Sequence, residues 1–366
     1  MNPVVSSIVE EQETLTFTLS GVNVSIANGL RRVTEEIPSV VFRTTPYEAN
    51  RVTFEVNTTR MNNEILKQRL SCIPIMSKVG DFPIDEYAVV VNKQNKSTSI
   101  EYVTTEDFKV VNVATSKIDA ELTRKLFPPN PMTGDYIELV RLLPRVSDTI
   151  EGEQLEFTGK FDIGTSKQDS AFNVVHTCVY GNTQDKAKVK SVWAEKKAEL
   201  GKIYNAEEMA FAEKDWQLLD AKRFFLPDSF DFKIESTGQY TNMEIMNTAS
   251  QLMIEKLKRL QETIQSETSI VSLSETTIPN SYDILLKNEG YTLGKVVEFV
   301  LYELHYNKTL HFCGFRKPHP HIDESIIRIG FKNPVDKVTV VSYIVNAAKD
   351  AIAVYEKINK VFKIGN

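Results

Sequence analysis

The feature that most constrains the fold of this chain is an internal duplication of one α/β pattern. Residues 14–19 alternate polar and apolar side chains, as in a half-buried strand, and an amphipathic run that ends at Pro38 follows them. The last quarter of the chain repeats this order as a strand, a helix, two strands and a long helix, at 282–286, 292–304, 310–315, 325–331 and 335–362. The repeat predicts two related units that pack against each other.

Each unit carries two amphipathic helices whose apolar stripes need a cover. In the first helix, Ile26, Leu30, Val33 and Ile37 recur at spacings of four, three and four, which places them on one face. A helix at 242–265 and the terminal helix, with Val338, Ile344 and other apolar residues on one face, carry similar stripes. Docking of the two units would bury four stripes in one four-helix interface. The alternative is two unrelated α/β domains with separate cores.

The first unit is interrupted by a long insertion. Its residues from 85 to 172 are rich in Val, Ile, Thr and Tyr, and Asn62 is placed to cap a helix at 63–70. The predicted fold class is α+β, with two dimerisation units paired through a four-helix interface and a β-rich inserted domain in the first. The predicted domains are a first unit, an inserted domain that ends in a helical extension at about 182–221, a linker and a second unit, at 1–50 with 222–265, 51–221, 266–277 and 278–366.

Composition narrows the class of partner and the compartment. The net charge of the 366 residues is −6 and the pI is about 5.6, whereas a protein that grips DNA unaided usually has a basic surface. Cys72, Cys178 and Cys313 lie far apart and form no CxxC pair, which favours a reducing, intracellular compartment. No apolar run approaches the ~18 residues of a membrane span, and the N-terminus has no signal-peptide pattern, so we expect no membrane partner.

Three segments resemble a known family. Residues 25–33 (SIANGLRRV), followed by Glu36-Ile37-Pro38, resemble the first helix of the alpha-like subunits of multisubunit RNA polymerases. Residues 62–75 (NNEILKQRLSCIPI) and 230–238 (FDFKIESTG) are similar to further segments of the larger alpha-like subunit, which is the archaeal D subunit or the third subunit of the eukaryotic enzyme. The resemblance implies a role in transcription by a DNA-directed RNA polymerase.

The C-terminal unit resembles the smaller partner, which is the archaeal L subunit or the eleventh eukaryotic subunit. Residues 288–294 (NEGYTLG) and 314–320 (GFRKPHP) are similar to its two signatures. In cellular polymerases the two partners are separate chains that form a heterodimer, and here they are fused with the large partner first. Such fusions are typical of large DNA viruses, so the resemblance implies a viral enzyme in the host cytoplasm or a viral factory, with packaging in the virion as a further alternative.

Two departures limit what the resemblance transfers. Cellular relatives often carry a cysteine cluster for zinc or iron–sulfur in the inserted domain, but residues 77–170 contain no Cys, so we expect no metal and no cofactor. Gln68, Ser71 and Ser170 stand where relatives often have His, Gly and His. These changes affect fine contacts more than the fold.

The resemblance implies a non-catalytic assembly subunit that pairs two alpha-like units into a platform for the two largest catalytic subunits and for small polymerase subunits. DNA and RNA would be contacted only through the complex. The residues predicted to form the intramolecular pairing and the contacts with the large subunits are Ile26, Asn28, Leu30, Arg31, Arg32, Val33, Glu36, Ile37, Pro38, Glu64, Arg69, Leu70, Pro74, Glu289, Gly290, Thr292, Leu293, Gly294, Val297, Pro318, His319 and Pro320.

Other chemistry is weakly supported by the sequence. The run at 290–294 lacks the Gly-Lys-Ser/Thr ending of a phosphate loop, and Thr292 is placed to cap a helix instead. His311, Cys313, His319 and His321 do not follow a standard zinc spacing. The adjacent acidic residues at 35–36 and 106–107 do not face one another, so no catalytic residues are predicted. Two alternatives stay open, a free-standing dimeric binding module and a metal hydrolase built on the three histidines.

Overall fold

The computed structural model describes residues 1–147 and 149–363 and divides into two compact units. The first unit comprises Met1–Thr34, Thr177–Glu235 and the chain from Asn242 onward, and the second comprises Glu35–His176 and Ser236–Thr241.

The first unit contains two four-stranded antiparallel sheets with the same topology. One sheet has the order β1-β2-β12-β11, with strands Val4–Glu11, Thr14–Ser20, Phe225–Ser236 and Val175–Gln184. The other has the order β13-β14-β16-β15, with strands Val271–Leu273, Ser281–Lys287, Glu324–Phe331 and Leu310–Arg316. Across each sheet, the first two strands form a hairpin, the fourth strand in chain order pairs with the second, and the third strand in chain order lies at the edge. The duplication predicted from the sequence is therefore present in the strand order itself.

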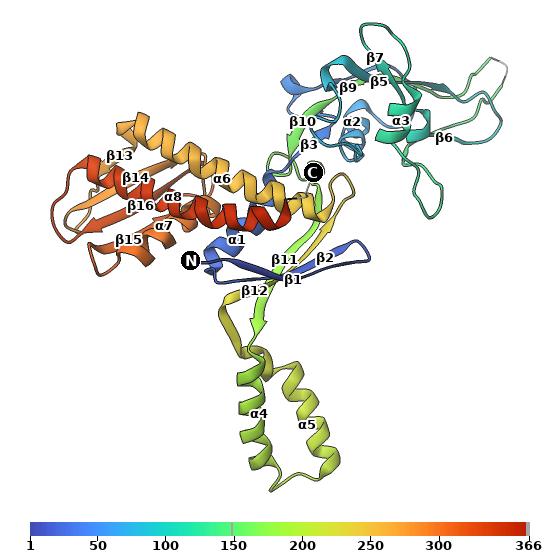
Figure 1. Cartoon of the computed structure of the whole chain (residues 1–366). Helices are drawn as coiled ribbons and strands as arrows, with labels where there is room; N and C mark the ends of the chain where they lie inside the picture. Colours follow the sequence, from blue (N-terminus) through green and yellow to red (C-terminus); the bar gives the residue numbers. More distant parts are fainter. Residues whose placement is uncertain (148, 364–366) are drawn as a thin grey trace. The chain divides into compact units, whose positions relative to one another are not determined.

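Four helices join these sheets into one body. They are α1 (Val24–Val33), α6 (Asn242–Ser266), α7 (Tyr291–His305) and α8 (Lys337–Phe362). The helices α6 and α8 run antiparallel side by side (Figure 1), since the Asn359 side chain donates a hydrogen bond to the carbonyl of Asn247 at 3.0 Å and Gln261 donates to the carbonyl of Val345 at 2.9 Å. The helices α1 and α7 contact each other, and each also contacts a long helix. This is the predicted α+β fold with a four-helix pairing.

Two details of the predicted stripes were wrong. The helix α1 ends at Val33 and a three-residue 3-10 turn follows, so Ile37 is buried outside the helix. The physical reason is Pro38, which disfavours helical backbone at the preceding residue. In α8, Val338 is 75% exposed. The hydrogen bond from Gln261 to Val345 sets these two residues side by side, so the first turn of α8 extends beyond the end of α6. The end of α6 therefore does not cover Val338.

Strand pairing assigns several segments differently from the predicted domain limits. The strand β3 (Pro38–Val41) was predicted as the next strand of the first duplicated pattern. It pairs instead with β10 (Asp162–Thr165) in the β-rich second unit of the structure. Its counterpart in the duplicated sheet is β11, so residues from 177 onward belong to the first unit. The segment predicted as a linker contains β13, which pairs with β14, and the N-terminal strand β1 was not predicted.

The second unit is a β-rich body with its own core. Its main sheet has the order β4-β9-β5-β7, with strands Val52–Asn57, Gln154–Lys160, Tyr87–Gln94 and Lys109–Asn112. A further strand pair is formed by β6 (Glu101–Thr104) and β8 (Glu138–Leu142), and the unit also contains the helices α2 (Asn63–Ser71) and α3 (Ala120–Leu126). As the sequence predicts, Asn62 caps α2, accepting a hydrogen bond from the Ile65 amide at 3.0 Å. The core includes Leu66, Leu70, Val89 and Phe157.

A helical hairpin extends from the strands β11 and β12 (Figure 1). Its helices are α4 (Lys186–Leu200) and α5 (Ala206–Leu218), and they form the helical extension that the sequence predicts at about 182–221. At the base, the Asp185 amide donates a hydrogen bond to the carbonyl of Phe224 at 3.0 Å. We call this hairpin the arm.

Candidate functional site

The centre of the four-helix interface is at Gly29 on α1. A Cβ atom at this position would lie 2.6 Å from the hydroxyl of Tyr355, 3.1 Å from Val296 and 3.6 Å from Met253. These three residues belong to α8, α7 and α6, so one glycine marks the point where all four helices meet. The absence of a side chain allows α1 to approach the other three helices closely.

The predicted apolar residues of the two short helices are buried in this interface. Ile26, Leu30 and Val33 are fully buried on α1, as are Leu293 and Val297 on α7. The buried hydroxyl of Tyr355 donates a hydrogen bond to the carbonyl of Ile26 at 3.2 Å. Burial raises the pKa of Tyr355, so the phenol stays protonated as a donor. The first helix of the N-terminal half of this unit is thus held by the last helix of its C-terminal half.

The end of α8 also contacts the first sheet. The rings of Phe362 and Phe17 are 4.9 Å apart in an edge-to-face arrangement, and Phe17 stacks on Phe232 at 4.9 Å. Phe17 and Phe232 lie on β2 and β12. The last helix of the chain therefore contributes to the core against the N-terminal sheet, which extends the pairing beyond the four helices.

A partly buried ion pair crosses the same interface. The ammonium group of Lys256 on α6 lies 2.9 Å from a carboxylate oxygen of Glu289, and their side chains are only 8% and 18% exposed. The carbonyl of Glu289 also accepts a hydrogen bond from Ser325 at 2.8 Å. Glu289 was predicted from the sequence, but Lys256 was not, because it lies among the apolar residues of α6 and its partner is 33 residues away in the chain.

The Lys256–Glu289 pair makes a testable contribution to stability. We expect Lys256→Met and Glu289→Gln each to lower the free energy of unfolding by about 2 kcal/mol, because each removes the 2.9 Å contact from a desolvated charged group. Combining both should recover most of the loss. Urea unfolding of the three variants measures this coupling, and equal additive losses would show that the pair does not act as a unit.

The start of α7 differs from its prediction at one residue. Gly290 is the N-cap, without a side-chain cap, so the predicted capping role of Thr292 was wrong. A Thr cap needs to precede the first helical turn, whereas Thr292 lies within it. Gly294 lies directly beneath the ring of Phe315, where a Cβ would overlap the ring. This contact brings α7 close to β15.

Several predicted residues of α1 lie at or near its surface. Asn28 and Arg31 are half-buried, and the Arg31 guanidinium donates a hydrogen bond to Asn28 Oδ1 at 3.0 Å. Arg32 is exposed.

Burial is the largest influence on the thiol of Cys178 and raises its pKa to about 12, while the nearby Arg31 and Thr34 act in the opposite direction.

Other predicted residues belong to the second unit. Glu36 forms an ion pair with Lys167 at 3.4 Å, and Pro38 begins β3. On α2, Glu64 is exposed, Leu70 is buried in the β-rich core, and Arg69 donates a hydrogen bond to the carbonyl of Glu138 at 3.1 Å. The half-buried Pro74 follows α2. Leu70 therefore supports the second unit from within.

The predicted turn with two prolines is exposed. Pro318, His319 and Pro320 lie between β15 and β16, and the His321 amide donates a hydrogen bond to His319 Nδ1 at 3.1 Å. Over residues 1–147 and 149–363, no group of three or more His, Cys, Asp or Glu side chains is arranged to hold a metal ion.

Comparison with known proteins decides the family. The model of the RNA polymerase Rpb3/Rpb11 dimerisation domain matches residues 16–257, and a second model of that domain matches residues 281–361. The chain belongs to the RNA polymerase Rpb3/Rpb11 dimerisation-domain family. It carries two such domains in tandem, which agrees with a fused alpha-like subunit.

Two archaeal relatives align with most of the chain. DNA-directed RNA polymerase subunit Rpo3 of Pyrococcus furiosus is 23% identical over 288 residues, which cover 72% of this chain and 98% of the relative. The corresponding subunit of Pyrococcus horikoshii is 24% identical over 276 residues, which cover 69% of this chain and 95% of the relative.

The second dimerisation domain has a charged contact within its sheet. Asp283 on β14 accepts two hydrogen bonds from the Arg328 guanidinium on β16, at 2.6 and 2.7 Å. Burial opposes ionisation of Asp283, but the bonds from Arg328 and Ser274 outweigh it and lower the pKa of the carboxyl.

Burial raises the pKa of the Cys313 thiol on β15 to about 12. Burial is also the main reason that the pKa of His305 is lowered.

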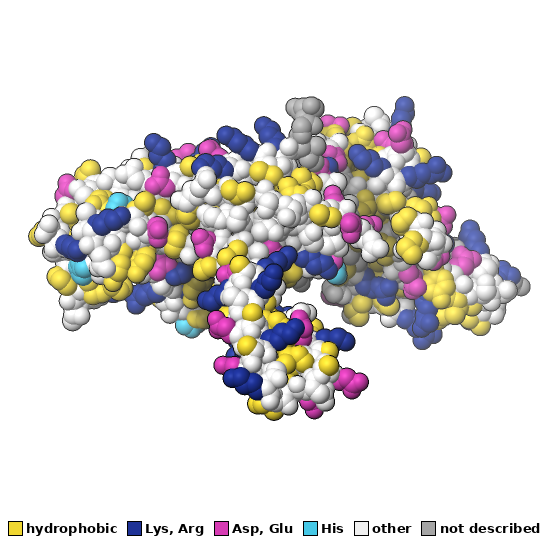
Figure 2. Space-filling model, turned by 60° about the horizontal axis from the view of Figure 1, so that its bottom comes forward, with side chains coloured by type: hydrophobic (Ala, Val, Ile, Leu, Met, Phe, Trp, Pro, Cys, Tyr) yellow, Lys and Arg dark blue, Asp and Glu magenta, His cyan; other side chains and the backbone are white. Residues whose placement is uncertain are grey.

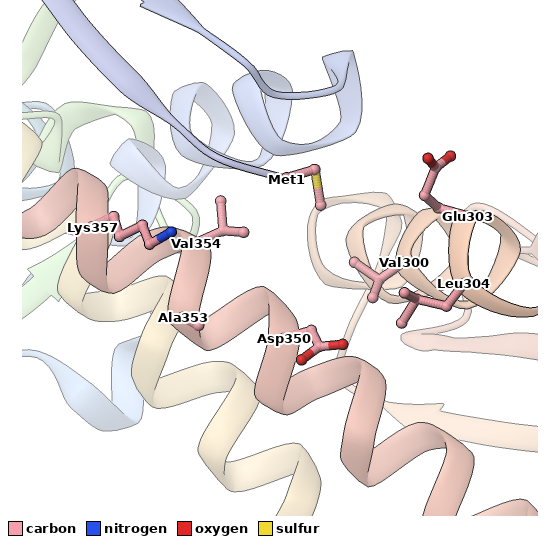
Figure 3. A pocket seen from close by; sticks show the side chains of 8 residues that line it. All are labelled: Met1, Val300, Glu303, Leu304, Asp350, Ala353, Val354 and Lys357. Carbon is pink, nitrogen blue, oxygen red and sulfur yellow. The ribbon is translucent and has the colours of Figure 1, made fainter.

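A cavity of about 280 Å³ lies between α7, α8 and the N-terminal residue Met1. Figure 3 shows the side chains that line it, with charged groups and apolar groups together. The lining residues are Met1, Val300, Glu303, Leu304, Asp350, Ala353, Val354 and Lys357.

The sequence predicts no apolar run of the length of a membrane span, but the helix α8 is long and apolar enough to cross a membrane by length and composition. Its buried residues include Val340, Ile344, Ala348 and Tyr355, and they pack within the four-helix interface. This packing accounts for the apolar composition of α8 as that of a core helix.

Proposed function

We propose that this chain is a non-catalytic assembly subunit of a DNA-directed RNA polymerase. Its paired dimerisation domains would form the platform on which the two largest catalytic subunits assemble. The observation that carries the proposal is the presence of two Rpb3/Rpb11 dimerisation domains in one chain, already paired through Gly29, Tyr355 and the Lys256–Glu289 contact. The similarity to an archaeal Rpo3 subunit over 72% of this chain supports it.

The surface residues around the pairing interface provide groups for the large subunits. Arg31 and Arg32 lie at the end of α1, and a guanidinium group makes forked hydrogen bonds with carboxylates or carbonyls of a partner. The exposed turn with Pro318, His319 and Pro320 offers a rigid loop on the second dimerisation domain. In the second unit, Glu64 and Arg69 on α2 offer a further polar surface.

The role of such a platform is to bring two large chains together in one orientation. Fusion of the two dimerisation domains makes their association intramolecular, with an effective concentration on the order of millimolar, so the platform forms without a separate encounter. The large subunits would supply the magnesium site and the nucleic-acid channel. We include in the proposal that the polymerase is viral, because the fusion of both partners is the arrangement that the sequence resembles.

The experiment that tests this function is purification of the tagged native chain with identification of its partners by mass spectrometry. We expect two much larger chains in equal amounts, together with template-dependent RNA synthesis in the eluate. A chain that purifies alone and shifts duplex DNA in a gel would overturn the proposal and favour a free-standing binding module. Purification from infected cells and from virus particles, if a virus is the source, tests the viral part.

A further inference from the structure

The arm is held together by the inner faces of its two helices. Trp193 on α4 stacks on Trp216 on α5 with ring centroids 6.0 Å apart, and Trp216 also contacts Phe224 at 5.7 Å. The Lys196 ammonium group lies 4.3 Å above the Trp216 ring and 3.3 Å from Asp220. These contacts join α4 and α5 without using the opposite side of α5.

The opposite side of α5 exposes large apolar side chains. Phe211 and Leu218 are 74% and 64% exposed, and they lie seven residues apart, which places them on one face two turns apart. Trp216 is five residues from Phe211 and therefore points away from this face. Glu207 and Asp215 lie four residues before and after Phe211. We call these four residues, Glu207, Phe211, Asp215 and Leu218, the outer face of α5.

This exposure is not explained by the folding of the arm itself. An exposed Phe and Leu at helical spacing are the anchors that an amphipathic helix uses when it binds a groove or another helix. At the end of the arm, Ile203 is also exposed, with 78% of its surface accessible. Apolar side chains are visible on the surface of the arm between charged groups in Figure 2. The arrangement indicates a surface that another molecule covers.

The charges of the arm specify the kind of partner. The helix α5 contains four carboxylates and one lysine, and the side chains of Glu207 and Asp215 form no ion pair or hydrogen bond with the described residues. The neighbouring helix α4 instead contains five lysines and two glutamates. A basic partner is therefore attracted to the outer face of α5 and repelled from α4, whereas the phosphates of a nucleic acid would be repelled from the outer face.

We propose that the outer face of α5 is a docking site for an amphipathic helix of another polymerase subunit, one with an apolar seam flanked by Lys or Arg. Phe211 and Leu218 insert into that seam, and Glu207 and Asp215 meet the flanking basic groups. The inference rests on the proposed function, since it takes the partner to be part of the same complex. It assigns a role to the arm that the pairing of the dimerisation domains does not require.

The first test is site-specific cross-linking in the purified polymerase. A photoreactive phenylalanine analogue at Phe211 should form a cross-link to one other subunit, and mass spectrometry should map it to a helix with apolar residues at heptad spacing and flanking Lys or Arg. The same analogue at Ala194, on the exposed face of α4, is the matched control and should not cross-link to that helix. A cross-link from position 211 to nucleic acid, to a second copy of this chain or to nothing overturns the proposal.

The second test uses charge substitutions that do not touch the core of the arm. Phe211→Asp should reduce retention of the cross-linked subunit by about tenfold or more, whereas Ala194→Asp should leave it unchanged. Asp215→Lys should weaken retention at low salt and lose its effect at high salt. Unchanged retention in Phe211→Asp refutes docking at this face.

These tests separate the inference from the proposed function. In all three variants the two largest subunits should still copurify with the chain, because the four-helix interface is unchanged. Loss of only the docked subunit supports the inference, and no polymerase from the unmodified chain would instead contradict the proposed function.

Discussion

Replacing Leu30 with Asp should prevent the two dimerisation domains from pairing. Leu30 is fully buried on α1, which packs on α7 and α6. Loss of a buried leucine costs about 2–5 kcal/mol, and burying an unpaired carboxylate adds several more. The sum is comparable with the entire stability of a typical domain, about 5–15 kcal/mol. We expect an insoluble or largely unfolded chain, measured by soluble yield and by the urea midpoint.

Val24→Asp is the matched control for this prediction. Val24 lies on the same helix but is exposed, so the same substitution places the carboxylate in water. We expect a change in the free energy of unfolding within about 0.5 kcal/mol. A Leu30→Asp chain that unfolds at the same urea concentration as Val24→Asp, and that enters the polymerase normally, would show that α1 does not join the two domains.

Substitution of Gly29 by Val should have the second-largest effect. The new Cβ would lie 2.6 Å from the hydroxyl of Tyr355 and 3.1 Å from Val296, so two other helices must move. Overpacking of this kind typically costs about 1–3 kcal/mol, and a branched side chain at the meeting point of four helices should reach the upper end. An exposed helical glycine behaves differently, because its replacement by Ala usually stabilises by about 0.5–1 kcal/mol. The change in the thermal unfolding temperature of Gly29→Ala therefore tests the contact. A lower temperature supports the close approach at Gly29, and a higher temperature contradicts it.

Removal of the Tyr355 hydroxyl should relieve part of this strain. We expect Gly29→Ala combined with Tyr355→Phe to be more stable than the sum of the two single changes predicts, by about 1 kcal/mol. Gly181→Val is the control, because no atom lies within 4 Å of a Cβ at that exposed position. Additive effects of the two changes would show that Gly29 and Tyr355 do not meet as described.

Local periodicity was enough to predict several of the helices and strands. The spacing of Ile26, Leu30 and Val33 predicted α1, and the alternation at 14–19 predicted β2. The capping role of Asn62 was also predicted from its position directly before the helix at 63–70. These features depend on residues a few positions apart, so the sequence contains their cause.

Contacts between distant segments were not predictable in the same way. Lys256 lies in a helix that looks apolar along one face, and only the fold brings Glu289 beside it. The strand at Val40 has the same local pattern as a strand of the duplicated sheet, yet it pairs with β10 in the second unit. Backbone hydrogen bonds between strands do not depend on sequence distance, so local patterns cannot assign them.

The sequence by itself determined that this chain has two related amphipathic units, and it favoured their pairing because the apolar stripes on four helices need a cover. Only the tertiary structure decided which atoms meet. It placed Gly29 where four helices converge, assigned β11 to the duplicated sheet, and left Phe211 exposed on the arm. Close packing is specified by pairs of residues far apart in the chain, and a periodic pattern carries no information about such pairs.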